Sequence, residues 1–233
     1  MRLTCAATFE RMEVTLKTEA VIFDMDGVLT DSEWFIAEAG RLMFKENHGI
    51  EVTHADFLPF VGHGEDRFLG GVAARHGVAS FDLARDKART YELYEALARG
   101  KLNELPGASA FVQSCRDLGL RTALATSTDR VKMLVNLLEI GLADGAFDAL
   151  VNGLDVERKK PFPDIFLEAA RRIGVIPGNC WVVEDSVGGV TAAIAAGMRC
   201  LALLTTFPES ELRAAGATLI AQDLSAIKAS SLI

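Results

Sequence analysis

Residues Val21–Glu33 read VIFDMDGVLTDSE: a short apolar run leads directly into two carboxylates that stand two positions apart. A continuous apolar run is typical of a buried parallel strand, and open α/β sheets place their chemistry at the carboxyl ends of such strands. Side chains alternate along a strand, so Asp24 and Asp26 leave the same side. Because their charges repel, the pair requires a bound cation or a retained proton. From these residues alone, a solvated acidic turn is the alternative.

Ten of these residues, DMDGVLTDSE, resemble the first motif of the haloacid dehalogenase superfamily, in the DxDGxxxDSE form of its β-phosphoglucomutase-like branch. Such families use the first aspartate as a nucleophile toward phosphorus and the second as a general acid and base. The resemblance therefore implies these roles for Asp24 and Asp26. It also implies three further motifs, in a fixed order and each at the end of a strand.

The composition excludes several classes of protein. With 233 residues, 50% hydrophobic and 24% charged, the chain is typical of a soluble globular protein. The net charge of −8 argues against a nucleic-acid or anionic-membrane surface. No apolar stretch reaches membrane-spanning length, and the four cysteines show no C-x-x-C spacing. We expect free buried thiols in a cytoplasmic monomer with no nucleic-acid or membrane partner.

The order of the expected elements indicates an α/β fold that is interrupted once. After the first strand, about seventy residues show helical spacing of apolar side chains and no convincing strand. From Leu105 onward, helices alternate with strands expected at 121–125, 149–152, 180–183 and 199–204. Such alternation predicts βαβ units and a parallel sheet.

We therefore expect a Rossmann-like α/β core with a helical cap domain inserted after the first strand. The expected limits are an N-terminal lead-in at 1–19, the core at 20–34 and 103–233, and the cap at 35–102.

The second candidate motif is ALATST, residues Ala123–Thr128, at the end of an expected strand. A hydroxyl there, together with free N–H groups of the next helix, can hold a phosphate. Helix capping is the alternative from the residues alone. The family's second motif is an apolar strand that ends in Ser or Thr, which Thr126 matches, and Ser127 is a second candidate for phosphate contact.

The third motif is RKKPFPDIF, residues Arg158–Phe166. A basic run followed by prolines is also typical of a solvated face before a helix. K-P-x-P-D-I-F resembles the family's third motif, and the matching lysine is Lys160, while we expect Lys159 to be exposed. A lysine at this place would pair with the nucleophilic carboxylate and with phosphoryl oxygens, which reduces the repulsion between two anions.

The fourth motif is WVVEDSVGG, residues Trp181–Gly189, where an apolar strand again ends in paired carboxylates. Helix capping by the residues after the strand is the alternative. The segment resembles the family's EDSxxG motif, whose acidic residues complete an all-oxygen site for Mg²⁺. By that resemblance, Asp24, the main-chain carbonyl of Asp26, and Asp185 bind the ion directly, and Glu184 binds it through water or lies nearby.

The resemblance implies Mg²⁺-dependent hydrolysis of a small phosphorylated metabolite, with a sugar phosphate as the expected class. A sugar-phosphate mutase uses the same parts, but the sequence departs from the β-phosphoglucomutase pattern at two cap positions. Ile36 stands where that enzyme has a histidine. The segment Gly62-His63-Gly64-Glu65 stands where it has an arginine for a distal phosphate, which Glu65 would repel. Both departures favour a phosphatase. His63, between two glycines, is a candidate for contact with the leaving group.

Two other interpretations belong to different classes. One is a regulatory or interaction domain that keeps the fold without turnover; the complete set of motif residues argues against it. The other is dehalogenation, which the proton donor Asp26 does not favour. The cap loop PFVGHGEDRFLGG also resembles the phosphatase-like domain of plant thylakoid quenching suppressors.

Overall fold

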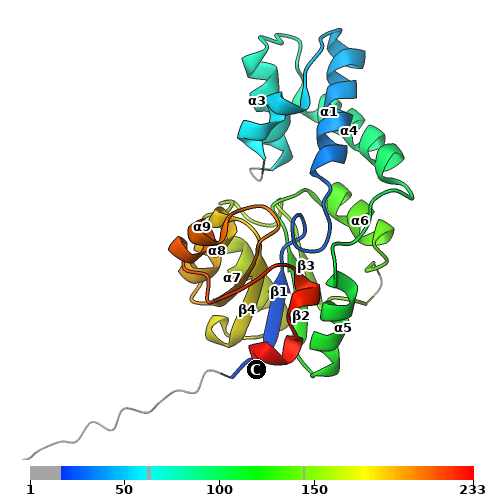
Figure 1. Ribbon diagram of the computed structural model, residues 1–233. Coiled ribbons are helices and arrows are strands. Elements are labelled where there is room, and N and C mark those ends of the chain that lie inside the picture. The colour runs from blue at the N-terminus through cyan, green and yellow to red at the C-terminus, as the bar shows by residue number, and fades with distance from the viewer. Residues whose placement is uncertain (1–16, 62–63, 144) are drawn as a thin grey trace, which may run out of the picture.

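The core of the protein is one parallel sheet (Figure 1). The computed structural model describes residues 17–61, 64–143 and 145–233. Six strands run through these residues: β1 (Ala20–Phe23), β2 (Arg121–Ala125), β3 (Ala149–Val151), β4 (Cys180–Glu184), β5 (Arg199–Leu203) and β6 (Leu219–Ala221). Their order is β3-β2-β1-β4-β5-β6, and every pairing is parallel. The predicted α/β sheet is confirmed, with the strand of the first motif at its centre.

Helices cover both faces of this sheet. They are α5 (Ala108–Asp117), α6 (Arg130–Glu139), α7 (Asp164–Ile173), α8 (Val187–Ala195) and α9 (Glu209–Ala214), with short 3₁₀ helices η2 (Pro177–Asn179), η3 (Leu224–Ala226) and η4 (Ala229–Leu232). Because strand side chains alternate, Phe23 packs into the cluster that includes α5 and α6, and Ile22 into the cluster on the α7 and α8 side. Burial on both faces explains why β1 is wholly apolar.

Between β1 and α5 the described residues form helices and no strand. These are α1 (Glu33–His48), α2 (His54–Phe57), η1 (Leu58–Phe60), α3 (Glu65–Arg75) and α4 (Leu83–Ala98). They enclose their own hydrophobic cluster, which contains Met43, Phe44, Phe57, Leu69 and Tyr94. Figure 1 shows them as a separate group above the sheet. The expected helical insertion is present, and its proposed limits at 35–102 stay a prediction.

Smaller expectations have mixed outcomes. Cys115, Cys180 and Cys200 are free and buried, as expected, whereas Cys5 lies outside the described residues. The strand expected at 149–152 ends one residue earlier, because the Asn152 N–H donates to the Asp155 carboxylate, 2.9 Å away, and leaves the ladder. Within the described residues, no helix is both long and apolar enough to cross a bilayer.

Two leucines test the placement of the core. Leu124 is fully buried on β2, whereas Leu138 on α6 is 68% exposed. We expect Leu124→Ala to lower the free energy of unfolding by about 2–5 kcal/mol, because it removes buried methyl groups and leaves a cavity. Leu138→Ala, the matched control, should change it by less than about 0.5 kcal/mol. Urea unfolding of both variants measures this, and equal losses would contradict the fold described.

Candidate active site

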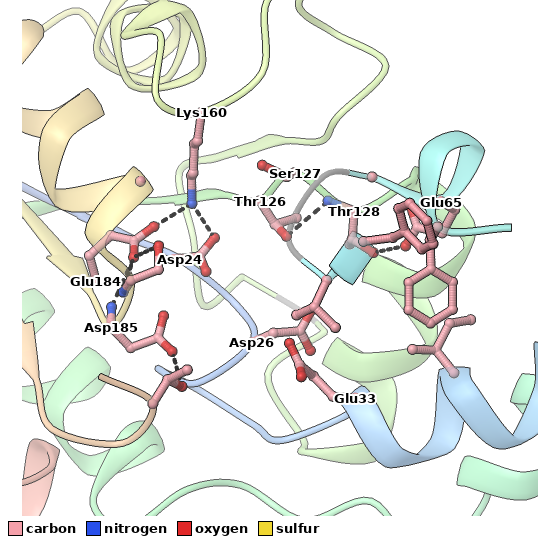
Figure 2. A pocket seen from close by; sticks show the side chains of 18 of the residues that line it. Asp24, Asp26, Glu33, Glu65, Thr126, Ser127, Thr128, Lys160, Glu184 and Asp185 are labelled. Carbon is pink, nitrogen blue, oxygen red and sulfur yellow. Dashed lines mark hydrogen bonds and ion pairs between the residues drawn. The ribbon is translucent and has the colours of Figure 1, made fainter. Parts of the chain in front are cut away.

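A cavity of about 580 Å³ lies where the ends of β1, β2 and β4 face the helices of the insertion. The structure brings seven of the eight residues singled out from the sequence to its wall: Asp24, Asp26, Thr126, Ser127, Lys160, Glu184 and Asp185. Figure 2 shows all seven around one space. The eighth, His63, lies outside the described residues. These seven residues are far apart in the sequence, and the parallel order of the sheet brings them together.

Lys160 joins two of the carboxylates. Its Nζ lies 2.7 Å from Asp24 Oδ1 and 2.6 Å from Glu184 Oε1 (Figure 2). Burial lowers the pKa of Lys160, but the charges of Asp24 and Glu184 outweigh it and hold the pKa above its usual value. The side chain is therefore an ammonium ion that cancels part of the negative charge at the end of β1, as the sequence predicted.

Three carboxylates gather where a cation would be expected. Asp24, Glu184 and Asp185 each place an oxygen within 4.8 Å of the others. Burial raises the pKa of Asp24 to about 7, and it raises the pKa of Asp185 as well, with the Glu184 charge adding to the shift. An all-oxygen, buried and negatively charged set fits a hard divalent ion such as Mg²⁺. The side chain of Asp26 is outside this cluster, and a contribution from its main-chain carbonyl stays a prediction.

Glu184 is occupied by protein donors. Besides Lys160 on Oε1, its Oε2 accepts from the Asp185 N–H at 2.9 Å, the Ser186 N–H at 2.8 Å and the Ser186 hydroxyl at 2.9 Å. The Asp185 carboxylate accepts from the Thr206 hydroxyl. Glu184 is thus held as part of the framework, which agrees with an indirect rather than a direct place in a metal site.

Two glycines leave room for these carboxylates. A Cβ at Gly189, in the first turn of α8, would overlap the Glu184 carboxylate, and one at Gly27 would overlap Asp185. Gly27 also has φ of 78°, a conformation that side chains disfavour. The glycines of the first and fourth motifs are therefore required by close approach.

Asp26 has two donors of its own. Its Oδ1 accepts from the Ser32 hydroxyl, and its Oδ2 lies 2.6 Å from Nζ of Lys132, on α6. Lys132 was not among the residues predicted from the sequence. The available signal was that Lys132 and Asn136, four positions apart, share a helix face with the apolar side chains of Met133 and Leu137.

The second motif lies at the cavity wall, and none of its described side chains caps α6. The Thr126 hydroxyl accepts from the Thr128 N–H at 3.2 Å (Figure 2), whereas the residue that precedes α6 is Asp129. The Ser127 hydroxyl is buried and has no hydrogen-bond partner among the residues that the structure describes. An unpartnered hydroxyl at the cavity wall is suited to accept a ligand, because leaving it unpaired costs free energy.

Two carboxyl groups from the insertion also line the cavity, Glu33 and Glu65. Burial, followed by the neighbouring Asp26 charge, raises the pKa of Glu33 to about 7. Glu65 is buried, accepts from the Thr128 hydroxyl and lies 3.1 Å from the Asp129 N–H; its burial raises its pKa. The sequence analysis treated Glu65 only as a missing arginine and did not foresee that it joins α3 to the start of α6.

The expectation that Lys159 is exposed is wrong. Lys159 is half-buried, and its ammonium donates to the carbonyl of Gly153. This hydrogen bond to a main-chain carbonyl explains why Lys159 is half-buried although it belongs to a run of basic residues.

A family model for haloacid dehalogenase-like hydrolases matches residues 18–197, which contain every strand end of the cavity. The chain belongs to the haloacid dehalogenase-like hydrolases. The predicted superfamily is confirmed. This chain is similar to SUPPRESSOR OF QUENCHING 1, chloroplastic, of Arabidopsis thaliana, with 44% identity over 219 residues, 93% of this chain and 21% of that protein. It therefore spans about a fifth of the length of that relative.

Other haloacid dehalogenase relatives match over most of their length. Phosphorylated carbohydrates phosphatase of Thermotoga maritima is 35% identical over 190 residues, 77% of this chain and 82% of that protein. The crystal structure of CbbY from Rhodobacter sphaeroides in complex with phosphate superposes with a TM-score of 0.79 at 27% identity, covering 89% of this chain and 95% of that one. This chain is therefore a hydrolase by family, and the relatives that it matches over most of their length include a named phosphatase.

Adjacent glycines on α8 test the close approach to Glu184. Nothing lies within 4 Å of a Cβ at Gly188, whereas one at Gly189 would displace the carboxylate. We expect Gly189→Ala to lower the free energy of unfolding by about 1–3 kcal/mol through overpacking. Gly188→Ala should be neutral or raise it by up to about 1 kcal/mol through helix propensity. Denaturant unfolding distinguishes the two; equal stability would contradict the described packing.

Proposed function

We propose that the protein is a Mg²⁺-dependent phosphatase that hydrolyses a small phosphorylated metabolite, of the sugar-phosphate class, through an aspartyl-phosphate on Asp24. The observation that carries this proposal is the contact of Lys160 with Asp24 and Glu184, beside the three carboxylates that fit a divalent ion. A nucleophilic carboxylate held by a cation is what attack on an anionic phosphoryl group requires.

In the proposed first step, a carboxylate oxygen of Asp24 attacks the phosphorus of the monoester. The bond between phosphorus and the alcohol oxygen breaks, and Asp26, in its protonated form, gives that oxygen a proton so that the alcohol leaves neutral. Lys160 offsets negative charge on the phosphoryl oxygens, and the unpartnered Ser127 hydroxyl, with Thr126 beside it, contacts the phosphoryl group.

In the second step, Asp26 takes a proton from a water molecule that attacks the phosphorus. The bond from phosphorus to Asp24 breaks, which restores the carboxylate and releases inorganic phosphate. We propose Asp24, Asp185 and the main-chain carbonyl of Asp26 as the metal ligands, with Glu184 indirect. Bound there, Mg²⁺ supplies positive charge that reduces repulsion between nucleophile and substrate.

The cavity wall supports a phosphatase over a mutase. Ile36 and Glu65, the two departures from the mutase pattern, both line it, and no arginine is among its described lining residues. A mutase must bind the second phosphate of a sugar bisphosphate, and a buried glutamate opposes that anion.

A phosphate-release screen over sugar phosphates, nucleotides and small monoesters tests the proposal. We expect release with Mg²⁺, none with EDTA, and a loss of at least about 10³-fold in Asp24→Asn, since that variant lacks the nucleophile. The exposed Asp117→Asn serves as the control and should retain activity. Formation of an isomeric sugar phosphate without free phosphate would indicate a mutase and contradict the proposal.

The raised pKa of Asp24 predicts how Mg²⁺ binding depends on pH. The pKa of Asp24 in the folded protein, about 7, lies above its ordinary value of 3.8, so the metal-free protein loses stability as pH rises from about 4 through 7. Because Mg²⁺ requires the carboxylate, its affinity should increase about tenfold from pH 6 to pH 8. Thermal unfolding with and without Mg²⁺ measures this, and Asp185→Asn should remove the Mg²⁺ effect. A Mg²⁺ shift that is independent of pH would contradict the proposed ligands.

A further inference from the structure

A second buried lysine, Lys132, lies in the active site and has no role in the mechanism above. It comes from α6, its side chain is 5% exposed, and it lines the same cavity. Its Nζ is 2.6 Å from Asp26 Oδ2. Burying an ammonium ion costs several kcal/mol unless it is paired, so a lysine at this place requires an explanation.

The contacts around Lys132 fix the Asp26 carboxyl group from two directions. The hydroxyl of Ser32, the residue before α1, donates to Asp26 Oδ1, and Asn136 Nδ2 lies 3.3 Å from that hydroxyl. The Tyr94 hydroxyl of α4 donates in turn to Asn136 Oδ1. Lys132 and Asn136 stand one turn apart on α6, so one helix face supports both oxygens of Asp26.

Lys132 and Lys160 serve different carboxylates. Lys160 contacts Asp24 and Glu184, on the side where the phosphoryl group is proposed to bind. The carboxyl groups near Lys132 are instead Asp26 and Glu65; burial lowers the pKa of Lys132, and the neighbouring groups, Asp26 first, hold it above its usual value. Lys132 therefore belongs to the side of the cavity where the alcohol leaves.

We propose that Lys132 is a positioning residue that acts through Asp26 in the first step. It fixes the carboxyl group next to the leaving oxygen, so that little conformational freedom is lost on the way to the transition state. When Asp26 gives its proton to that oxygen, it becomes a carboxylate, and the ammonium at 2.6 Å stabilises it. This inference rests on the proposed function and adds a residue to it.

The leaving group distinguishes this role from a structural one. A substrate with an alkyl alcohol needs a proton on the leaving oxygen, whereas p-nitrophenol leaves as a stable anion and needs none. We expect Lys132→Met to lower kcat/KM by about 10²-fold for an alkyl phosphate taken from the screen. For p-nitrophenyl phosphate, the fall should be less than about threefold. Asp26→Asn should show the same selectivity, and adding Lys132→Met to it should change kcat/KM less than about threefold.

Lys87→Met is the matched control. Lys87 also pairs with aspartates, at 2.6 Å from Asp66 and 2.8 Å from Asp129, but not with Asp26. Any loss in this variant should be equal for the two substrates. Thermal unfolding of each variant checks that it folds. Lys132→Arg keeps the positive charge but changes its position. Its kcat/KM for the alkyl phosphate should fall less than that of Lys132→Met.

The proposal is overturned if Lys132→Met lowers kcat/KM equally for both substrates. It is also overturned if the effect of Lys132→Met on kcat/KM adds in full to that of Asp26→Asn. Should Lys132→Met not fold, Lys132→Arg decides: a selective loss on the alkyl phosphate supports the role, and an equal loss or none overturns it. Wild-type protein that releases phosphate from no substrate would overturn the phosphatase proposal and this one together. An active wild type with an unselective Lys132 variant would overturn this one alone.

Discussion

The site depends on one electrostatic constraint: four carboxyl groups meet at the ends of two adjacent buried strands. Asp24 and Asp26 follow β1, while Glu184 ends β4 and Asp185 follows it; the Asp24 N–H donates to the Val183 carbonyl at 3.0 Å, which fixes their register. Burial, together with the neighbouring Glu184 charge, raises the pKa of Asp24 and of Asp185 and so opposes ionisation of these two groups. Cations must offset this charge. Lys160 does so on one side and Lys132 on the other, and a divalent ion fits between the remaining oxygens.

The core and the helical insertion contribute different residues to the cavity around these carboxyl groups. The sheet supplies the reacting groups, because parallel strands end at one edge. The insertion supplies much of the rest of the cavity, and it is tied to the core by side chains rather than only by the chain connections. Glu65 binds the start of α6, and Tyr94 reaches Asn136 on the same helix. The insertion also carries the two cavity residues, Ile36 and Glu65, that depart from the mutase pattern.

The fold was predictable from the alternation of helices and apolar runs, whereas the acidic site was predicted through the resemblance of its motifs to the family, since the residues alone left a solvated turn open. Apolar runs that end in Asp or Glu identify strand ends, and parallel order brings those ends together. Lys132 was not predictable, since it stands 106 positions from Asp26 and a helical face does not reveal which cavity it meets. The role of Glu65 was also not predictable, because its hydrogen-bond partner Thr128 lies 63 positions away in the sequence. The prediction that Lys159 is exposed was wrong for a simpler reason. A run of basic residues does not show which of its side chains will donate to a main-chain carbonyl.

The proposed reaction depends on a covalent bond between Asp24 and phosphorus. The most direct measurement is acid quenching during turnover with Mg²⁺, followed by intact mass measurement and mapping of the modified peptide. The account requires a mass increase of one phosphoryl group on the peptide that contains Asp24, absent from Asp24→Asn. We expect more of this species in Asp26→Asn with p-nitrophenyl phosphate, because breakdown by water then lacks its base. Phosphate release with no phosphorylated protein in either background, or a phosphoryl group on another residue, would contradict the account.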